Sequence, residues 1–170
     1  MLDEWRLTAK SITKYNPIYR DRDGLYTKNE WIGFFQVGKT INGKKLTLED
    51  YLQVEEKYIQ SAIAFFLFHG CKEIVLNNVE KNGPFQSKLS ADGELLTVYN
   101  VLKDRMIITI EDLGIIIKLI LREYIWAELF SIESDLVAIR FGYDFYMYVN
   151  SDKDLGTFFK DVHNTGLFVW

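Results

Sequence analysis

The pattern that most constrains this chain is a long amphipathic segment near its centre, Leu48–His69. Thr47 can cap its start and Gly70 can end it. The apolar side chains between these two residues recur at intervals of three and four positions, which is typical of a helix that buries one face. They are Leu48, Tyr51, Leu52, Tyr58, Ile59, Ala62, Ile63 and Phe66. We therefore expect one long helix with the core built against that face.

Short strands dominate the rest of the chain, and most of them follow one another directly. The patterns predict strands over Glu4–Ile12, Lys72–Val79, Glu94–Leu102, Met106–Ile110, Tyr124–Phe130, Leu136–Gly142 and Phe145–Val149, and a hairpin at Asn42-Gly43. They predict further helices over Lys28–Val37, Asp112–Leu121 and Ser151–His163, an extended Leu167–Trp170, and core positions for Trp31, Phe34 and Phe35. Because regular strand–helix–strand alternation is missing, we expect an α+β fold with a largely antiparallel sheet and three to four helices.

No feature of the sequence suggests a domain boundary. The chain has 170 residues, which is an ordinary size for one domain. It contains only 2 prolines, and it shows neither a glycine- and serine-rich linker nor an internal repeat. We expect residues 1–170 to form a single α+β domain.

Composition limits the partners and the compartment. With 20 Lys and Arg against 24 Asp and Glu, the net charge of -4 disfavours non-specific binding of nucleic acid, which needs a basic face. A lone cysteine, Cys71, excludes an internal disulfide and fits a reducing compartment. The first residues lack the basic and apolar parts of a signal peptide, and the apolar runs are too short to span a bilayer. We expect a cytoplasmic protein that binds neither nucleic acid nor membrane, and we leave its oligomeric state open.

Signatures of catalysis and of cofactor binding are absent from the sequence. It has no glycine-rich phosphate loop, no H-E-x-x-H and no G-x-S-x-G. His69 and His163 each stand at the predicted end of a helix, where an imidazolium complements the helix dipole. Cys71 fits a small buried residue at a corner between helix and strand. We expect no enzymatic activity, no cofactor and no metal.

One loop overlaps with part of a calcium-binding motif. Asp21, Asp23 and Gly24, followed by Glu30, have the spacing of the third, fifth, sixth and twelfth positions of such a loop. Tyr19 occupies the first ligand position, however, and the two arginines within the segment would repel a cation. Glu30 also completes a predicted capping box with Thr27 at the start of a short helix. We interpret the segment as a solvated Asp-Gly turn.

The last predicted hairpin carries a tyrosine-rich strand. Alternation along it places Tyr146 and Tyr148 on one face of the sheet and Phe145, Met147 and Val149 on the other, which we expect to be core. The tyrosine face can be a partner-binding surface, because tyrosine offers a large contact area with few torsions to immobilise. It can equally be a half-buried second face of the sheet. Both readings stay open at this point.

Parts of both halves of the chain resemble a family of small uncharacterised bacterial proteins. The matching segments are Lys14–Arg20 (Lys-Tyr-Asn-Pro-Ile-Tyr-Arg), Gly24–Tyr26, Glu30-Trp31, Leu121–Glu123 with Trp126, and Phe141–Tyr148. The chain departs from that family at Phe34–Gly38, where a Ser/Asp-Ile-Gly stretch usually stands. Such proteins look like the immunity proteins of bacterial toxin systems, including contact-dependent growth inhibition. The resemblance implies a protein that binds and neutralises a cognate toxin domain, often a nuclease, and it implies no catalytic residue.

This resemblance and the acidic balance lead to one functional hypothesis. We expect an immunity protein that covers the toxin's active site, with carboxylates opposite basic groups that would otherwise hold phosphate. The expected contacts are Asp21, Asp23, Tyr143, Asp144, Tyr146 and Tyr148. The alternative is a small ligand-binding protein or an enzyme with an unrecognised pocket. A deep cavity in which Asp21, Asp23, Glu30 or a histidine meets aromatic walls would favour that alternative.

Overall fold

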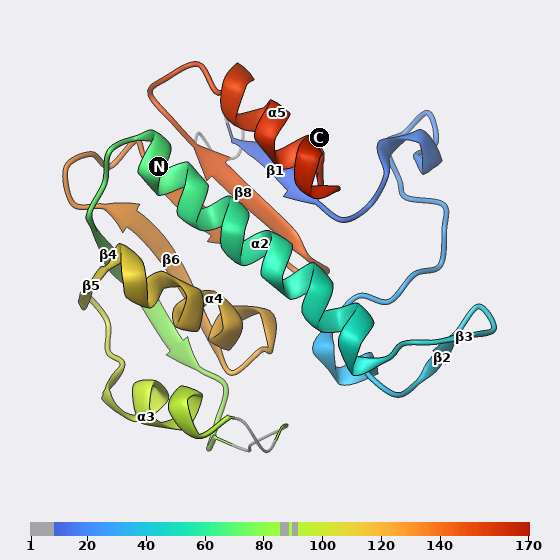
Figure 1. The fold of residues 1–170 in the computed structure, drawn as a ribbon, viewed down its shortest axis with the longest axis horizontal. Helices are drawn as coiled ribbons and strands as arrows, with labels where there is room; N and C mark the ends of the chain where they lie inside the picture. Colours follow the sequence, from blue (N-terminus) through green and yellow to red (C-terminus); the bar gives the residue numbers. More distant parts are fainter. Residues whose placement is uncertain (1–8, 86–88, 90–91) are drawn as a thin grey trace.

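A seven-stranded antiparallel sheet with helices over one face forms the body of the protein (Figure 1). This computed structural model describes residues 9–85, 89 and 92–170. The strands are β1 (Lys10–Thr13), β4 (Glu73–Lys81), β5 (Ile107–Thr109), β6 (Ile125–Ser131), β7 (Ala138–Phe141), β8 (Tyr146–Asn150) and β9 (Phe168–Val169). They lie in the order β5-β4-β6-β7-β8-β1-β9, and every neighbouring pair is antiparallel.

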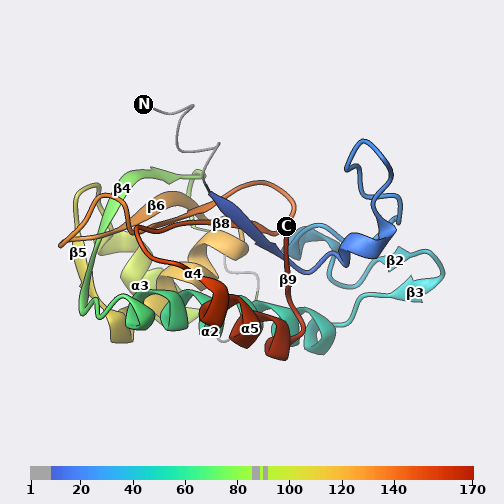
Figure 2. The same ribbon diagram turned by 90° about the horizontal axis from the view of Figure 1, so that it is seen from above.

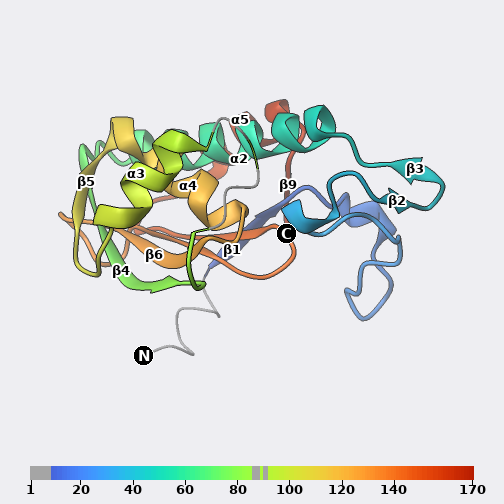
Figure 3. The same ribbon diagram turned by 90° about the horizontal axis from the view of Figure 1, so that it is seen from below.

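The helices all lie on the same side of this sheet. They are α2 (Leu48–Phe68), α3 (Gly93–Val101), α4 (Leu113–Leu121) and α5 (Gly156–Thr165), with single 3-10 turns at Pro17–Tyr19, Phe34–Gln36 and Ile110–Asp112. The views from above and below both show the helical layer on one face of the strands (Figures 2 and 3). A separate hairpin, β2 (Thr40–Ile41) with β3 (Lys44–Lys45), projects beyond the sheet. The α+β fold with a largely antiparallel sheet is confirmed.

The long helix predicted from the sequence is α2, and its ends have the expected caps. The Thr47 hydroxyl accepts a hydrogen bond from the Asp50 backbone N–H at 3.0 Å, and the Asp50 carboxylate accepts one from the Thr47 N–H at 3.4 Å. The helix ends at Phe68, with His69 as its C-cap and Gly70 in the left-handed conformation at φ 74°. Its buried face crosses the sheet between α4 and α5 (Figure 1).

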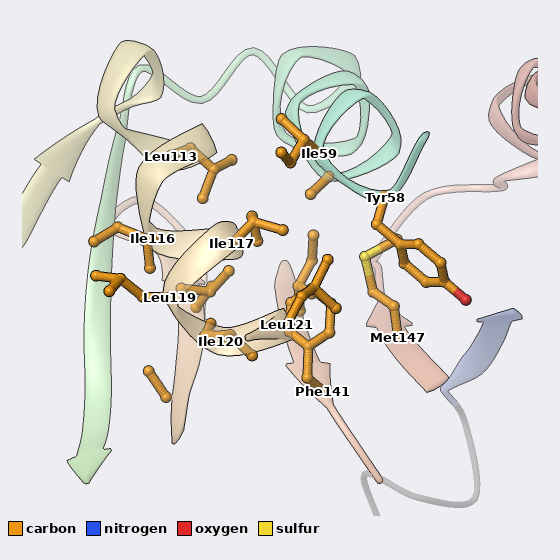
Figure 4. Packing of buried hydrophobic residues seen from close by; sticks show 14 of the residues in the cluster. Tyr58, Ile59, Leu113, Ile116, Ile117, Leu119, Ile120, Leu121, Phe141 and Met147 are labelled. Carbon is orange, nitrogen blue, oxygen red and sulfur yellow. The ribbon is translucent and has the colours of Figure 1, made fainter. Parts of the chain in front are cut away.

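The short helix α4 lies deep in the core, which explains its nearly continuous apolar sequence. Figure 4 shows its side chains packed between Tyr58 and Ile59 of α2 and Phe141 and Met147 of the sheet. The side chains that α4 buries are Leu113, Ile116, Ile117, Leu119, Ile120 and Leu121. A helix buried on almost every side has little need of polar positions. The helix predicted over Asp112–Leu121 is confirmed, with its α-helical part at Leu113–Leu121.

The pleat of β8 distributes its side chains as predicted. Met147 and Val149 are buried against the helices, whereas Tyr146 and Tyr148 are half-buried on the opposite face of the sheet. The register pairs Tyr148 with Ser11 and Met147 with Ile12 of β1, so both faces continue across the strand pair.

Two predicted elements are wrong. The segment Glu94–Leu102 is α3, not a strand, since Leu95, Tyr99 and Leu102 recur at helical spacing and are buried together. The β-branched pair Thr97-Val98 favoured a strand locally, but tertiary burial outweighs that preference.

The second wrong element is the predicted helix Lys28–Val37, which contains only the 3-10 turn Phe34–Gln36. Its capping box does not form, because Thr27 hydrogen-bonds to the Tyr19 carbonyl and Glu30 is bound to other side chains.

Two predicted elements have different boundaries in the structure. The last helix begins at Gly156 and ends at Thr165, later than predicted at both ends. The first strand is observed at Lys10–Thr13, and residues 4–8 of its predicted range lie outside the described residues. Within the part of the chain that is described, no helix combines the length and the apolar character needed to cross a bilayer.

Candidate partner-binding site

A pocket of about 370 Å³ opens where the start of β6, the end of β7 and the β7–β8 hairpin meet. The ladder between β6 and β7 ends at the pair Glu128–Arg140, and the strands continue beyond it without pairing to each other. We call this cavity the hairpin-tip pocket. It is lined by Ile32, Phe35, Asn82, Ile120, Leu121, Glu123, Ile125, Trp126, Phe141, Gly142, Tyr143, Asp144 and Phe145.

The backbone at the tip of this hairpin adopts an unusual conformation. Asp144 and Phe145 both have positive φ, at 59° and 61°, as a type I′ turn requires. Aspartate tolerates this region, but for a large aromatic residue it is an outlier. The Phe145 carbonyl accepts a 2.5 Å hydrogen bond from the buried Tyr58 hydroxyl, and the Phe145 ring packs edge-on against Trp31 with centroids 5.1 Å apart. Packing of Phe145 into the core therefore holds the turn in place.

Four large apolar side chains stand at the surface around the pocket. Tyr143 is 94% exposed, Phe35 48%, Ile32 38% and Trp126 36%. They come from three separate segments, and the Trp126 indole N–H donates to the Phe141 carbonyl at 3.1 Å, which fixes its ring beside the hairpin. We call these four residues the apolar rim. A patch of this kind on a small protein is typical of an interaction site.

The charged residues among the lining are two carboxylates, Glu123 and Asp144, and the lining contains no lysine, arginine or histidine among the described residues. Glu123 also has a positive φ of 60°, in the turn between α4 and β6. Gly33 allows Glu123 and Phe35 to come close together. A Cβ at position 33 would lie 2.8 Å from Oε1 of Glu123 and 2.7 Å from the Phe35 ring. The pocket thus combines aromatic walls with negative charge.

Only two of the six predicted contact residues, Tyr143 and Asp144, line this pocket. Asp21 instead closes its own loop, because its Oδ1 accepts from the backbone N–H groups of Asp23 and Leu25 at 2.9 Å each. Asp23 is exposed in that loop. The interpretation of this segment as an Asp-Gly turn agrees with this geometry.

The predicted tyrosine face is tied to the same loop by Arg20. One guanidinium nitrogen of Arg20 donates to the Tyr146 hydroxyl at 2.7 Å, and another donates to the Gly24 carbonyl at 2.8 Å. Tyr146 and Tyr148 stack with centroids 6.3 Å apart. Both side chains are half-buried and in contact with other residues of the protein, which favours the interpretation as a half-buried second face of the sheet. Neither residue lines the hairpin-tip pocket.

Glu30, the last ligand of the possible calcium loop, is bound elsewhere. Its Oε1 accepts from the Tyr26 hydroxyl at 2.6 Å, and its Oε2 lies 3.4 Å from Nζ of Lys14. Among the described residues, no three His, Cys, Asp or Glu side chains are grouped so that they could hold a metal ion. Lys14 itself is enclosed by the rings of Tyr15 and Trp31, at 4.0 and 4.2 Å from their centroids. Burial lowers the pKa of Lys14 to about 8, although Glu30 and Asp144 oppose the shift.

Replacing Lys14 by methionine is expected to remove a pH dependence of stability. The unfolded chain, with a lysine pKa of 10.5, binds more protons than the folded chain between pH 8 and 10.5, so the wild type gains stability as the pH rises through that window. From about pH 7 to 9.5, the free energy of unfolding of the wild type should rise by roughly 2 kcal/mol relative to Lys14→Met. Urea denaturation at both pH values measures this, with the exposed Lys28→Met as control. The prediction is contradicted if the difference in the free energy of unfolding between wild type and Lys14→Met is the same at both pH values.

A second, wider groove of about 840 Å³ lies between the loop at residues 27–31, the β2–β3 hairpin and the first turns of α2. Glu30 and Trp31 are part of its lining, together with three lysines, Lys28, Lys44 and Lys45. It is more open and more polar than the hairpin-tip pocket.

The remaining candidates for chemistry have structural roles. Cys71 is buried, with its Sγ 3.3 Å from the Ser131 hydroxyl. The Nε2 of His69 lies 3.1 Å from the Ser151 hydroxyl, and its Nδ1 lies 3.6 Å from Asp152. The same Ser151 hydroxyl is bonded to both backbone groups of Lys153, so it closes a turn. Burial and nearby Lys153 lower the pKa of His69, and Asp152 opposes this shift. The imidazole therefore joins the end of α2 to the loop that follows β8.

Sequence reasoning missed most of the apolar rim. Phe35 and Phe34 were both assigned to the core, but only Phe34 is buried. Adjacent side chains in a 3-10 turn point in different directions, so one of two neighbouring phenylalanines had to face outward. No sequence signal indicated that Ile32, Trp126 and Tyr143 would meet.

Comparison of the chain with protein-family models, with curated proteins and with solved structures found no match.

Proposed function

We propose that this protein is an immunity protein that binds a cognate bacterial toxin domain through the hairpin-tip pocket and its apolar rim. The observation that carries the proposal is the exposure of four large apolar side chains around one concave site. Centres of protein interfaces are enriched in aromatic residues, and a few such anchors supply most of the binding energy. Covering the toxin's active site would then be enough to neutralise it, without catalysis by this chain.

The rigidity of the hairpin supports a binding role. Tyr143 stands at the edge of a turn whose conformation is fixed by the buried contacts of Phe145. A turn whose backbone is already held in place loses little conformational entropy when a partner covers it. A preformed surface of this kind suits a protein that must bind its target tightly.

Electrostatics supports a nuclease as the target. The two carboxylates of the hairpin-tip pocket and the net charge of -4 complement a toxin surface that carries basic groups for phosphate. Such complementarity would increase the association rate, which matters when a toxin acts quickly.

Co-expression with the C-terminal segment of the product of the gene immediately upstream tests the proposal, which expects that segment to be the toxin domain. Growth should stop when the toxin domain is expressed alone and recover when the wild-type protein is present. The double variant Tyr143→Ala, Phe35→Ala should lower the affinity of the purified pair at least about 30-fold, because two anchors at the centre of the interface are lost.

The matched control removes two exposed apolar side chains from α3, Leu96→Ala with Val101→Ala, neither of which lines the pocket. This control should bind and rescue growth like the wild type. The proposal fails if the wild type gives no rescue. The assignment of the surface fails if the control loses affinity as much as the rim variant does.

A small-molecule ligand is a second candidate, favoured by the 840 Å³ groove with Glu30 and Trp31 in its lining. Native mass spectrometry of the protein purified from its host would detect a bound compound. A bound compound that is lost when Gln53 of the groove is replaced by leucine would favour this function. A measured mass equal to that of the polypeptide alone would count against it.

A further inference from the structure

We propose that the hairpin-tip pocket receives the side chain of an arginine presented by the partner. This inference rests on the proposed function and adds the chemistry of its central contact. It follows from the combination of charge, aromatic walls and shape at one place in the fold.

The lining of the hairpin-tip pocket is negatively charged. Glu123 and Asp144 reach the lining from two different turns, the one between α4 and β6 and the one between β7 and β8. The described lining has no cation to neutralise them. The nearby cation Arg122 is occupied by Glu55 and Asp92. Lys14 is paired with Glu30 and also attracts Asp144 from outside the lining. A cationic group entering the pocket would therefore meet two carboxylates in a described lining that holds no cation.

Aromatic side chains form much of the wall of this pocket. Phe35, Trp126 and Tyr143 surround the opening, and Phe141 lies within the lining. Cations bind favourably over the faces of such rings, and tryptophan is the strongest partner. A guanidinium is planar and weakly hydrated, so it stacks on aromatic rings and gives up water more readily than an ammonium does. These walls favour arginine over lysine.

The backbone of the pocket lining has an unusual conformation at three residues. Glu123, Asp144 and Phe145 all have positive φ, between 59° and 61°, so three residues of the lining are held in a conformation that side chains other than glycine rarely adopt. Strain of this kind clusters where a protein must present groups in a fixed geometry. Here it fixes the backbone that carries both carboxylates before a partner arrives. A planar guanidinium can donate to two carboxylate oxygens at once, which suits this pair of acidic residues.

The volume is consistent with one long side chain. At about 370 Å³ the pocket is at the lower end of the range of ligand sites. The apolar lining from Ile120, Leu121 and Ile125 would contact the methylene groups of the entering side chain, while its head lies near the carboxylates.

The test uses N-acetyl-arginine methylamide as the probe, titrated into the 170-residue protein and followed by NMR. Shifts should concentrate at the residues of the hairpin-tip pocket, with a dissociation constant on the order of 10 mM. The neutral isostere N-acetyl-citrulline methylamide should bind at least about tenfold more weakly, because it keeps the shape but lacks the charge.

Two variants complete the experiment. Glu123→Gln with Asp144→Asn should weaken arginine binding at least about tenfold, and asparagine tolerates the positive φ at position 144. The matched control is Glu73→Gln with Asp161→Asn, which changes the net charge equally at exposed positions outside the pocket. It should bind the probe like the wild type.

The proposal is overturned if citrulline binds as well as arginine, if the pocket variant keeps its affinity, or if no shift occurs at a probe concentration of about 50 mM. These outcomes are separate from those of the growth test. Rescue of growth without arginine binding would leave the immunity function standing and remove the arginine anchor. Arginine binding without rescue would show a cation site on a protein with another role.

Discussion

Replacing Arg122 by methionine should lower the free energy of unfolding by about 3–5 kcal/mol, the largest single effect that we expect in this protein. Arg122 is buried, and it donates two hydrogen bonds to Glu55, at 2.8 and 2.6 Å, and one to Asp92 at 2.8 Å. Both carboxylates are buried as well. Without the guanidinium, two negative charges would remain in the interior without their cation, which is far less favourable than losing one hydrogen bond.

This ion cluster joins segments that are distant in sequence. Glu55 belongs to α2, Asp92 precedes α3, and Arg122 follows α4. The Tyr124 hydroxyl and the Leu89 N–H also donate to Asp92, at 2.9 and 3.0 Å. The cluster therefore fixes the positions of three helices relative to one another.

Urea denaturation of Arg122→Met measures the effect, with the exposed Arg22→Met as matched control, which should change stability by less than about 0.5 kcal/mol. Adding Glu55→Gln and Asp92→Asn to Arg122→Met should restore part of the loss, because the remaining buried groups are then neutral. A loss of less than about 1 kcal/mol in Arg122→Met would contradict the importance of this pairing.

Replacing Tyr58 by phenylalanine is expected to lower the free energy of unfolding by roughly 2–4 kcal/mol, although only one oxygen atom is removed. The buried Tyr58 hydroxyl accepts from the Lys14 N–H at 2.8 Å and donates to the Phe145 carbonyl at 2.5 Å. Phenylalanine would leave both backbone groups without this partner in the interior, and each such loss is unfavourable by about 1–3 kcal/mol.

The matched control is Tyr99→Phe, whose hydroxyl donates to the carbonyl of the exposed Gly83. Water can replace that bond, so the control should lose less than about 1 kcal/mol. Hydrogen exchange should also become faster in the β7–β8 hairpin of Tyr58→Phe than in the control, because the turn at Phe145 is no longer anchored. Equal stability losses in the two variants would show that the Tyr58 hydroxyl has no special role.

The Tyr58 variant connects the core to the candidate site. If the turn at Asp144 and Phe145 loses its anchor, Tyr143 and Asp144 are no longer held in one arrangement. Partner affinity should then fall in Tyr58→Phe even under conditions where the variant is fully folded.

The sequence by itself determined the elements whose signals are local. The capping box at Thr47, the helical spacing through Phe66 and the glycine at position 70 specify α2, and Asn42-Gly43 specifies the small hairpin. Alternation along β8 separates Tyr146 and Tyr148 from Met147 and Val149 for the same reason. In each of these cases the deciding interactions join residues only a few positions apart.

Only the tertiary structure decided the rest. Burial of Leu95 and Tyr99 makes α3 a helix despite its β-branched residues, and contacts to Tyr19, Tyr26 and Lys14 keep Thr27 and Glu30 from capping one. The candidate site has the same origin: of the six contact residues chosen from the sequence, Tyr143 and Asp144 line the pocket, while Phe35, Glu123 and Trp126 enter it from other segments. Those positions depend on contacts between residues far apart in the chain, and a local pattern carries no information about which distant partner will meet it.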